Sequence, residues 1–437
     1  MSFEARIRYV FIPGKNWKLS LAELVSFFQA RNCFFEVSEL TPAFFVISVG
    51  KSLDPSIIDE LGGFIKIARV TSDIAGDTVR EAFVRGNKEA KSQVRTDLLS
   101  GGLIDEMLES SSGKLIFGVS VYDGDGSLRR VSRAAQRFLG SSLKHELAVR
   151  GKKSRFMGFP RGRAEPQLSH VEVLKKNLVE QKGEILFCSG KEHATISTTV
   201  AVHNPFEFQK RDMGRPVQRK IFAIPPRLAR IMINQAFCTS GKSLLDPFCG
   251  VGTILQEALL AKARVVGLDV NPWCVKASKE NLEWIKKEYA LKEAEYVVVS
   301  GDSRRLADRI GQQIDCIATE PDLGPALRHI PTESYAMKIM HKLEPLYNQF
   351  MEEAYKVLKK QGRLVLVTPY IRTRSGRPVA MPIEKKATNL GFTVICPLRE
   401  AVFAGEDETK KDLARTVSFV DMEERHKIGR EIHIFEK

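Results

Sequence analysis

Short apolar runs that alternate with amphipathic stretches dominate the second half of the chain. The runs are rich in Val, Ile and Leu, and most are bounded by Gly, Asp or Ser. This alternation is typical of a parallel sheet whose faces are covered by helices, and it predicts an α/β fold. The predicted strands are 243–246, 264–269, 295–300, 314–319 and 363–368, and runs near 392–396, 415–420 and 430–435 predict an antiparallel end.

The first half of the chain predicts two smaller α+β units and a connection. The first unit has predicted strands at 8–12, 44–49 and 65–70 and helices at 21–30 and 56–61. Ser20 is its predicted helix N-cap, and Glu23, three residues on, completes a capping box. The second unit has predicted strands at 115–122, 184–188 and 194–202 and helices at 127–147 and 169–182. In the connection, residues 204–208 are expected to be extended, and two prolines open a helix at 227–237.

The stretch from Leu244 to Thr253 carries the first candidate chemistry. A predicted strand ends at Asp246, a loop with Gly250 and Gly252 follows, and a helix comes next. Ligands of doubly wound sheets bind beyond the carboxyl ends of the strands, and glycines let the backbone approach them closely. Asp269 ends the next strand 19 residues after Gly250, near the spacing of about 20 residues typical of a ribose-binding acid. These features predict a nucleoside ligand.

The loop chemistry discriminates among nucleoside ligands. The third glycine of a dinucleotide fingerprint is absent, and Asp246 would repel a pyrophosphate but attract an ammonium. S-adenosylmethionine carries an ammonium, a sulfonium and a ribose and no phosphate, so it is the predicted cofactor. Residues 246–253 therefore resemble the first motif of a class I methyltransferase. The plain alternative is a strand, turn and helix that bind no ligand.

The positive charge of the chain is concentrated in its middle. Residues 128–230 hold 22 Lys and Arg against 8 Asp and Glu, giving +14, which equals the net charge of all 437 residues. A basic field of this size suits a polyanion such as nucleic acid, although a merely solvated basic face is the alternative. The candidate RNA-binding residues are Arg129, Arg130, Arg133, Arg137, Lys152, Lys153, Arg155, Arg161 and Arg163.

Cysteine usage and hydropathy indicate the compartment. The seven cysteines are scattered, with no Cys-x-x-Cys pair and no Cys/His cluster, which favours a reducing cytoplasm and argues against a metal site or a disulfide framework. No cleavable leader is visible, and no apolar run approaches the roughly 18 residues of a membrane span. We expect a cytoplasmic protein that binds no metal and no membrane.

The order of these parts resembles the THUMP-containing RNA methyltransferases, and within them the tRNA guanosine-10 N2-methyltransferase family. The resemblance is carried by residues 225–234, the first motif at 246–253 and the run 319–325, and more weakly by residues 19–24. It implies a ferredoxin-like α+β domain (1–75), a THUMP RNA-binding domain (76–202), a linker with a leading helix (203–240) and a class I, Rossmann-like methyltransferase domain (241–437). It also implies tRNA as a partner, and some relatives need a small zinc-binding activator subunit.

The resemblance assigns roles to the residues at the strand ends. The implied cofactor-binding residues are Asp246, Phe248, Gly250, Gly252, Thr253, Asp269, Asp302 and Ser303. Asp302 would accept a hydrogen bond from the adenine amino group, or it is an ordinary helix cap. At the end of the fourth strand the family carries Asp/Asn-Pro-Pro-aromatic, whose side-chain oxygen and backbone carbonyl orient the exocyclic amine for transfer. The corresponding catalytic residues here are Glu320, Pro321, Asp322 and Leu323.

These four residues depart from the family pattern. Glu320 can still accept from an amine with a longer arm and Asp322 can be a second acceptor, but Leu323 cannot stack on a base as an aromatic ring does. The predicted function is methyl transfer from S-adenosylmethionine to an exocyclic amine, guanine N2 of tRNA. The alternatives are a DNA amino-methyltransferase and a non-catalytic RNA-binding protein with a degenerate pocket. Cys249 and Cys316, near the site, are expected to be small buried residues rather than nucleophiles.

Overall fold

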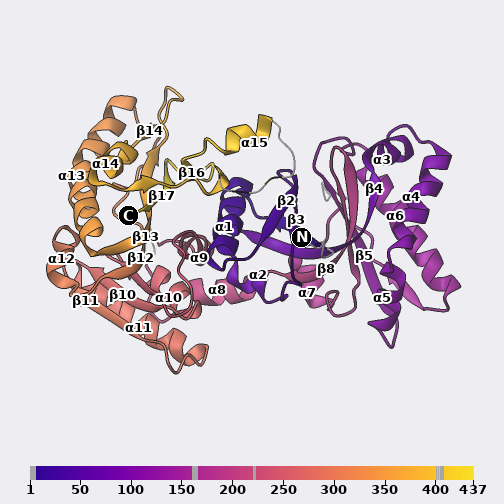
Figure 1. Cartoon of the computed structure of the whole chain (residues 1–437), viewed down its shortest axis with the longest axis horizontal. Helices are drawn as coiled ribbons and strands as arrows, with labels where there is room; N and C mark the ends of the chain where they lie inside the picture. The colour runs from indigo at the N-terminus through magenta and orange to yellow at the C-terminus, as the bar shows by residue number, and fades with distance from the viewer. Residues whose placement is uncertain (1–5, 160–165, 220–222, 400, 402, 404–407) are drawn as a thin grey trace.

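The structure, a computed structural model, describes residues 6–159, 166–219, 223–399, 401, 403 and 408–437. It is elongated and contains two parts, each built around one large sheet (Figure 1). Strands from the N-terminal part form an eight-stranded sheet, and strands between residues 243 and 436 form a nine-stranded one. The chain is therefore mixed α/β, and it contains an N-terminal part and a C-terminal part that each have their own sheet.

The N-terminal sheet has the strand order β2-β3-β1-β4-β8-β7-β5-β6. Its long strand β4 pairs antiparallel with β1 on one side and with β8 on the other, so hydrogen bonding continues from one predicted α+β unit into the next. The strands are β1 (Ile7–Pro13), β2 (Phe35–Leu40), β3 (Phe45–Val49), β4 (Phe64–Ala75), β5 (Leu115–Asp123), β6 (Ser154–Phe156), β7 (Glu184–Ser189) and β8 (His193–Val202).

Helices cover this sheet in two groups. Helices α1 (Trp17–Ala30) and α2 (Ile57–Glu60) belong to the half nearer the second sheet, and most of the others lie at the far end of the molecule (Figure 1). Helices α4 and α6 contact each other there, and α6 also packs on β5. The far group comprises α3 (Gly76–Phe83), α4 (Lys88–Ser100), α5 (Leu103–Glu109) and α6 (Ser132–Val149). Helix α7 (His170–Lys175) lies nearer the middle of the molecule and contacts β8 (Figure 1).

The predicted cap of the first helix is wrong. Helix α1 begins at Trp17, and Asn16 caps it by accepting a hydrogen bond from the backbone N of Leu19 at 3.3 Å. Ser20 lies buried inside the helix, and the Glu23 carboxylate accepts from the backbone N of Gly62 and of Gly63 at 2.7 Å each. A capping-box spacing does not distinguish a true cap from two polar residues that meet another segment.

Other predicted elements differ in extent or kind. Helix α6 begins at Ser132 rather than at residue 127, and α7 ends at Lys175 rather than at residue 182. The prediction that residues 204–208 are extended is wrong, because residues from Pro205 to Met213 form helix α8. The Asn204 side chain caps it, and Pro205 occupies the first turn, where a missing N–H costs nothing. Helices α3 to α5 and strand β2 have no counterpart among the predicted elements.

The C-terminal sheet confirms the predicted parallel strands and their antiparallel end. Its order is β11-β10-β9-β12-β13-β17-β15, with β14 paired to β13 and β16 to β17. The neighbouring strands β11, β10, β9, β12 and β13 are all parallel to one another. Strand β17 is antiparallel to β13, β15 and β16. The strands are β9 (Ser243–Asp246), β10 (Arg264–Asp269), β11 (Tyr296–Ser300), β12 (Ile314–Thr319), β13 (Leu358–Ile371), β14 (Val379–Ala380), β15 (Thr393–Val394), β16 (Ser418–Asp421) and β17 (Ile428–Glu436).

Helices flank the C-terminal sheet on both faces. The chain leaves β9 toward β10 and β11 on one side and returns to β12 and β13 on the other, so the strand order reverses between β9 and β12. That reversal is where ligands of open α/β sheets bind. The helices are α9 (Pro226–Gln235), α10 (Thr253–Leu260), α11 (Pro272–Glu288), η1 (Ser303–Arg305), α12 (Leu306–Arg309), α13 (Glu333–Val357), α14 (Ile383–Leu390), η2 (Pro397–Arg399) and α15 (Glu408–Leu413).

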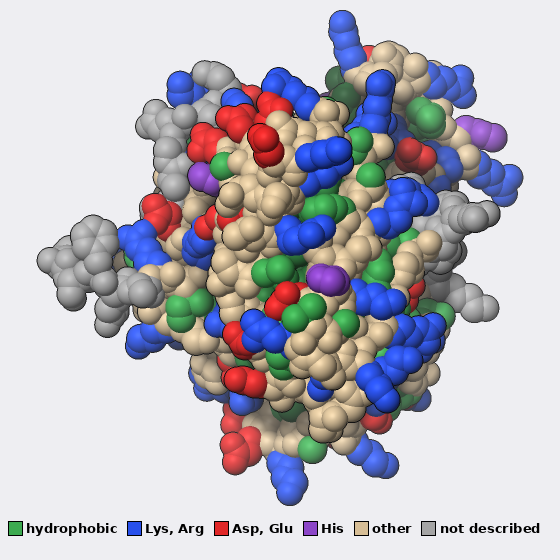
Figure 2. Space-filling model, turned by 90° about the vertical axis from the view of Figure 1, so that its right-hand side faces the viewer, with side chains coloured by type: hydrophobic (Ala, Val, Ile, Leu, Met, Phe, Trp, Pro, Cys, Tyr) green, Lys and Arg blue, Asp and Glu red, His purple; other side chains and the backbone are tan. Residues whose placement is uncertain are grey.

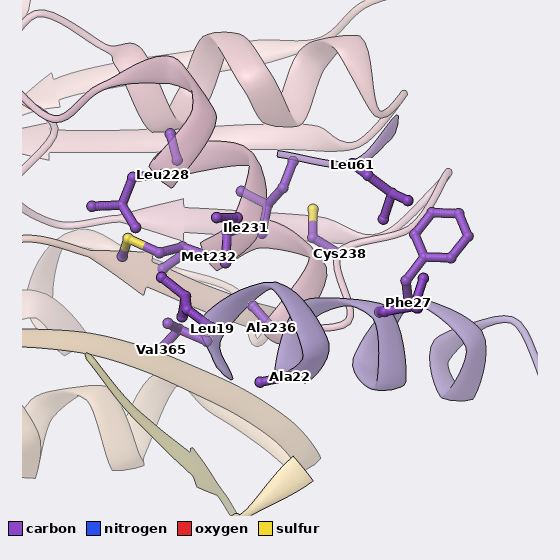
Figure 3. Close-up of a cluster of buried hydrophobic side chains, with 14 of the residues drawn as sticks. Leu19, Ala22, Phe27, Leu61, Leu228, Ile231, Met232, Ala236, Cys238 and Val365 are labelled. Atoms are coloured by element: carbon purple, nitrogen blue, oxygen red, sulfur yellow. The ribbon is translucent and has the colours of Figure 1, made fainter. Parts of the chain in front are cut away.

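Helix α9 joins the two parts. Figure 3 shows side chains of α1 meeting those of α9, and Val365 of β13 belongs to the same cluster. Leu19 and Ala22 of α1 and Met232 of α9 are at most 2% exposed. Burying each large apolar side chain stabilises by about 1.5–3 kcal/mol, so separating the two parts is costly.

Two sequence expectations concern cysteines and membranes. All seven cysteines are free, and only Cys33 is exposed. Within the described residues, no helix is both long enough and apolar enough to cross a membrane.

Candidate active site

A cavity of about 440 Å³ opens at the point where the strand order reverses. Its walls come from the loop after β9, the end of β10, the end of β12 and the segment that precedes α9. The lining residues are Arg219, Ala223, Ile224, Asp246, Phe248, Cys249, Gly250, Val251, Thr253, Ile254, Asp269, Val270, Asn271, Cys274, Glu320, Pro321, Asp322 and Leu323. The structure thus brings together most of the cofactor-binding residues expected from the sequence and all four catalytic ones.

Asp246 is the most deeply buried acid of the cavity, with 2% of its surface exposed. Its Oδ1 accepts hydrogen bonds from Thr319 Oγ1 at 2.6 Å and from the backbone N of Phe248 at 3.2 Å. Burial raises the pKa of the Asp246 carboxyl to about 7, and these two hydrogen bonds oppose the shift only in part. A cationic ligand group at this carboxyl would favour its ionised form.

The glycine loop is held in a shape that needs glycine. Gly250 and Gly252 have φ of +51° and +86°, in the left-handed region that other residues avoid. A Cβ on Gly252 would lie 2.5 Å from Ser278 Oγ. The backbone N of Gly250 donates to Asp269 Oδ2 at 2.9 Å, which ties the loop to the end of β10. Asp269 Oδ1 accepts from the backbone N of Asn271 at 2.8 Å, so the carboxylate is fixed at the cavity edge.

The residues after β12 are fixed from two sides. Arg430 of β17 donates to both carboxylate oxygens of Glu320, from Nε at 2.5 Å and from Nη2 at 3.2 Å. The hydroxyl of Tyr347, on α13, donates to the backbone carbonyl of Asp322 at 3.0 Å. Glu320 therefore already has a cationic partner, which the sequence did not indicate. No pattern links Arg430 to it, because the two lie 110 residues apart.

The segment before α9 is also part of the site. The sequence predicts that residues 203–240 form a linker and a leading helix, and that the helix closes one wall of the cofactor site. The Arg215 guanidinium donates to Thr253 Oγ1 at 2.6 Å, and both side chains are buried. The Asn281 side chain bonds the backbone N and carbonyl of Val217, at 2.9 Å each. This fastening places Arg219 against the glycine loop, where it lines the cavity. The local surplus of positive charge was the sole signal for these residues.

Three of the expected cofactor-binding residues do not line the cavity: Gly252, Asp302 and Ser303. Gly252 acts through the shape of the loop. The Asp302 carboxylate caps η1 through the backbone N of Arg304 and pairs with the Arg304 guanidinium at 2.6 Å, a bond that lowers the pKa of Asp302. Its role toward a cofactor stays a prediction.

The cavity residues fit S-adenosylmethionine by their donor and acceptor chemistry. A buried carboxyl at Asp246 suits an ammonium, and the fixed carboxylate of Asp269 suits paired ribose hydroxyls. Open backbone beside Gly250 leaves room for a close approach, since a Cβ there would meet nothing within 4 Å. No cluster of cations faces the loop that would favour a pyrophosphate; among the described lining residues Arg219 alone is basic.

The two cysteines near the site are buried, as expected. Burial raises the pKa of the Cys249 thiol well above its ordinary value, and Cys316 is 1% exposed on β12. A thiol held in its neutral form is a poor nucleophile. Cys249 lines the cavity with a thiol that burial keeps neutral, and Cys316 does not line it.

The expected absence of a metal site stays a prediction. Beside the C-terminal sheet, possible ligand atoms of Glu384, Glu431 and His433 lie within 4.8 Å of one another. His433 is fully buried, and its Nδ1 lies 3.1 Å from the Glu384 carboxylate.

The basic residues of the middle region lie at the far end of the N-terminal sheet. Arg129, Arg130, Arg133 and Arg137 lie on α6 and on the turn before it, and Lys153 and Arg155 lie near β6. Figure 2 shows this end of the molecule, with Lys and Arg side chains lining much of its right-hand side. The Lys152 ammonium is committed to the backbone carbonyl of Ser111. Arg161 and Arg163 lie outside the described residues.

The fold and the cavity together define a class. A doubly wound sheet with acids at the ends of β9 and β10 and a glycine loop between them is the arrangement of a Rossmann-like methyltransferase. Residues 215–375 match the sequence family described as "RMKL-like, methyltransferase domain", so this part of the chain is a methyltransferase domain.

Curated relatives of this domain carry a common name. The tRNA (guanine(10)-N2)-dimethyltransferase of Methanothermobacter thermautotrophicus is 33% identical over 162 residues, which is 36% of this chain and 43% of that protein. The protein of the same name from Pyrococcus abyssi is 33% identical over 202 residues, 46% of this chain and 55% of its own length. The chain thus spans about half the length of these relatives.

Similarity to a solved structure extends over the whole chain. TrmN from Thermus thermophilus superposes with a TM-score of 0.51 at 15% identity, covering 98% of this chain and 99% of that one. At this identity the likeness concerns the fold alone. It includes the N-terminal sheet as well as the methyltransferase domain.

Proposed function

We propose that this protein transfers a methyl group from S-adenosylmethionine to the exocyclic amine of guanine in tRNA, at N2 of nucleotide 10. The observation that carries the proposal is that Asp246, Asp269 and residues 320–323 line the same cavity. The relatives named above, whose name specifies guanine 10 of tRNA, support the choice of substrate, base and position.

The cofactor would be held by the loop after β9 and the end of β10. Asp246 would pair with its ammonium, Asp269 with its ribose hydroxyls, and Arg219 is placed to meet its carboxylate. When bound, S-adenosylmethionine supplies an electrophilic methyl group on a sulfonium. Residues on this chain then have two tasks: to hold the amine in line with that methyl and to exclude water.

Glu320 and the backbone after it would orient the amine. A carboxylate oxygen accepts a hydrogen bond from one N–H, and a backbone carbonyl near Pro321 accepts from the other, so the nitrogen lone pair points at the methyl carbon. The same acceptors stabilise the positive charge that develops on nitrogen. The target base must leave its stack to reach this cavity.

The N-terminal part would supply RNA affinity. We propose that residues 1–75 form a ferredoxin-like domain and residues 76–202 a THUMP domain, linked through 203–240 to the catalytic domain at 241–437. The arginines of α6 would contact phosphates, which gives affinity without reading sequence. A cytoplasmic location fits the seven free cysteines.

One observation favours a different function. Glu320 is already paired with Arg430, which is also what a pocket without catalysis would tolerate. In that second candidate the chain binds cofactor and RNA and transfers nothing. Methyl transfer itself discriminates the two.

The test is transfer of labelled methyl groups to unmodified tRNA transcripts, followed by nucleoside analysis. We expect labelled N2-methylguanosine that disappears when guanosine-10 is replaced. Glu320→Ala should abolish transfer and leave tRNA affinity nearly unchanged, whereas Lys279→Ala, on the exposed face of α11, should change neither. Transfer by the purified chain alone would exclude an obligatory activator subunit. No transfer, with tRNA and cofactor both bound and a zinc-binding activator subunit present, would support the non-catalytic candidate.

A further inference from the structure

Arg430 forms a two-point contact with Glu320, which lines the cavity. The guanidinium Nε and Nη2 each donate to a different carboxylate oxygen, and the two side chains are 14% and 9% exposed. Arg430 sits on β17, opposite Pro369 of β13, so its backbone is fixed within the sheet. Paired, parallel hydrogen bonds of this kind fix orientation as well as distance.

Other acidic groups surround this pair. The Glu320 carboxylate acts electrostatically on Asp246 at the end of β9 and on Tyr347 of α13, which Asp322 also affects. Asp421 of β16 acts on Arg430. Among the described residues that face Glu320 in these contacts, Arg430 is the one cation. Burial by itself lowers the pKa of the Arg430 guanidinium. The charge of Glu320 and its hydrogen bonds raise this pKa by more than burial lowers it, so the guanidinium stays charged.

We infer that Arg430 is a positioning residue that holds Glu320 in the geometry needed to accept from the substrate amine. This inference rests on the proposed function. A positioning role of Arg430 also explains how a glutamate can replace the shorter Asp or Asn of the family pattern. The extra methylene of glutamate adds one rotatable bond, and the two hydrogen bonds from the Arg430 guanidinium, its fork, fix the carboxylate despite that bond.

The hydrogen-bond capacity of the carboxylate allows this role. A carboxylate has about four lone-pair sites, two on each oxygen. The side-on contact with Arg430 uses one site on each oxygen, which leaves one on each for an amine N–H. The pair therefore does not block the acceptor function of Glu320.

The transfer step balances with these groups. The amine nitrogen forms its bond to the methyl carbon with its own lone pair, the electron pair of the carbon–sulfur bond stays on sulfur, and the nitrogen then releases one proton to solvent. Glu320 accepts a hydrogen bond throughout and is unchanged at the end. Arg430 is not among the residues that line the cavity, so it would act on the reaction through Glu320.

The test compares Arg430→Met and Arg430→Lys in the full chain. Arg430→Met removes the charge and the fork, and we expect kcat to fall about 100-fold, since small misplacements of a reacting group cost that much. The KM for tRNA and the Kd for S-adenosylmethionine should stay within about threefold, which allows for small packing changes. Arg430→Lys keeps the charge without the fork, and its kcat should fall about 10-fold, as expected for one point contact in place of two.

The pH profile separates positioning from mere structural support. Without the cation, a buried carboxyl beside Asp246 favours its protonated form, so Arg430→Met should gain an acid limb in kcat that the parent protein lacks. The double variant Glu320→Gln/Arg430→Met has no such carboxyl, and its residual kcat should not show the limb.

Three outcomes would overturn the inference. Arg430→Met could retain the parent kcat and pH profile, it could lose cofactor binding along with activity, or its acid limb could persist in the double variant. A parent protein that binds tRNA and cofactor but transfers no methyl group would instead overturn the proposed function, and this inference with it.

Discussion

Thr319 Oγ1 donates a hydrogen bond of 2.6 Å to Asp246 Oδ1, joining the ends of β12 and β9 at the point where the strand order reverses. Both side chains are buried, at 0% and 2% exposure. The bond fixes the carboxyl that begins the glycine loop to the strand that carries Glu320. The bond therefore fixes the position of Asp246, expected to bind the cofactor, relative to Glu320, expected to bind the substrate amine.

Asp246 should make cofactor binding depend on pH. Its pKa of about 7 means that the free protein holds a proton there below neutral pH, and pairing with an ammonium should expel it. The affinity for S-adenosylmethionine should therefore rise as pH increases from about 6 to 7.5, below the ordinary α-amino pKa of about 8. Calorimetry at about pH 6.5 in two buffers of different ionisation enthalpy should detect proton release.

Asp246→Asn is the matched variant, because the amide oxygen can still accept from Thr319. It should abolish the proton release and weaken binding by about 1.5–3 kcal/mol, the size of a charged hydrogen bond. Asp302→Asn, at the carboxylate paired with Arg304, should leave the release intact. Equal proton release in Asp246→Asn and the parent would show that another group titrates.

Glu23 should make stability fall as pH rises. Burial raises the pKa of this carboxyl from 4.5 to about 7, against the opposing bonds from Gly62, Asn234 and Gly63. Between these two values the native state binds more protons than the unfolded chain, so the contribution is fully present below about pH 4.5 and is lost as pH rises toward 7. The difference in melting temperature between the parent and Glu23→Gln should therefore change over this range.

The contacts of Glu23 give the size of the effect. Its Oε1 accepts from Asn234 Nδ2 at 2.8 Å and from Gly62 N at 2.7 Å, which connects α1 to α9 across the two parts. Glu23→Ala would leave buried donors without a partner and should destabilise by about 3 kcal/mol or more. A variant that melts like the parent at every pH would contradict this account.

The buried pair Lys66 and Glu184 should behave as a unit. Their side chains are 1% and 0% exposed, and Glu184 also accepts from Ser120 and Thr199 at 2.7 and 2.8 Å. Lys66→Met should destabilise by about 3–5 kcal/mol, because it leaves a buried carboxylate without its cation. Lys66→Met/Glu184→Gln should recover more than half of that in thermal unfolding, and a purely additive double variant would refute the coupling.

The arginines of α6 should contribute to tRNA affinity through charge alone. Arg133→Ala/Arg137→Ala should weaken binding and reduce the slope of log affinity against log salt by about 0.7–0.9 for each phosphate that is no longer neutralised. The kcat at saturating tRNA should be unchanged, since α6 and the C-terminal sheet lie at opposite ends of the molecule (Figure 1). Lys279→Ala serves as the control. Identical salt slopes in the double variant and the control would mean that the α6 face is only solvated.

The sequence predicted the site better where its residues follow strands than where they meet across the fold. Asp246 and Asp269 were found because apolar runs end at them, and both line the cavity. The cap at Ser20 and the extended stretch at 204–208 were wrong, because polar residues at helical spacing and a proline are compatible with more than one local structure. The segment around Arg215 and Arg219 carries no recognisable motif.

The sequence by itself determined the alternation of strands and helices, the glycine loop and the acids at the strand ends. These are local, since hydrophobic period and turn residues act within a few positions, and parallel strands then bring their ends to one edge. Only the tertiary structure decided which residues complete the site. The pairing of Arg430 with Glu320 and of Asn234 with Glu23 joins residues 110 and 211 positions apart, and such pairs depend on how β17 and α9 pack.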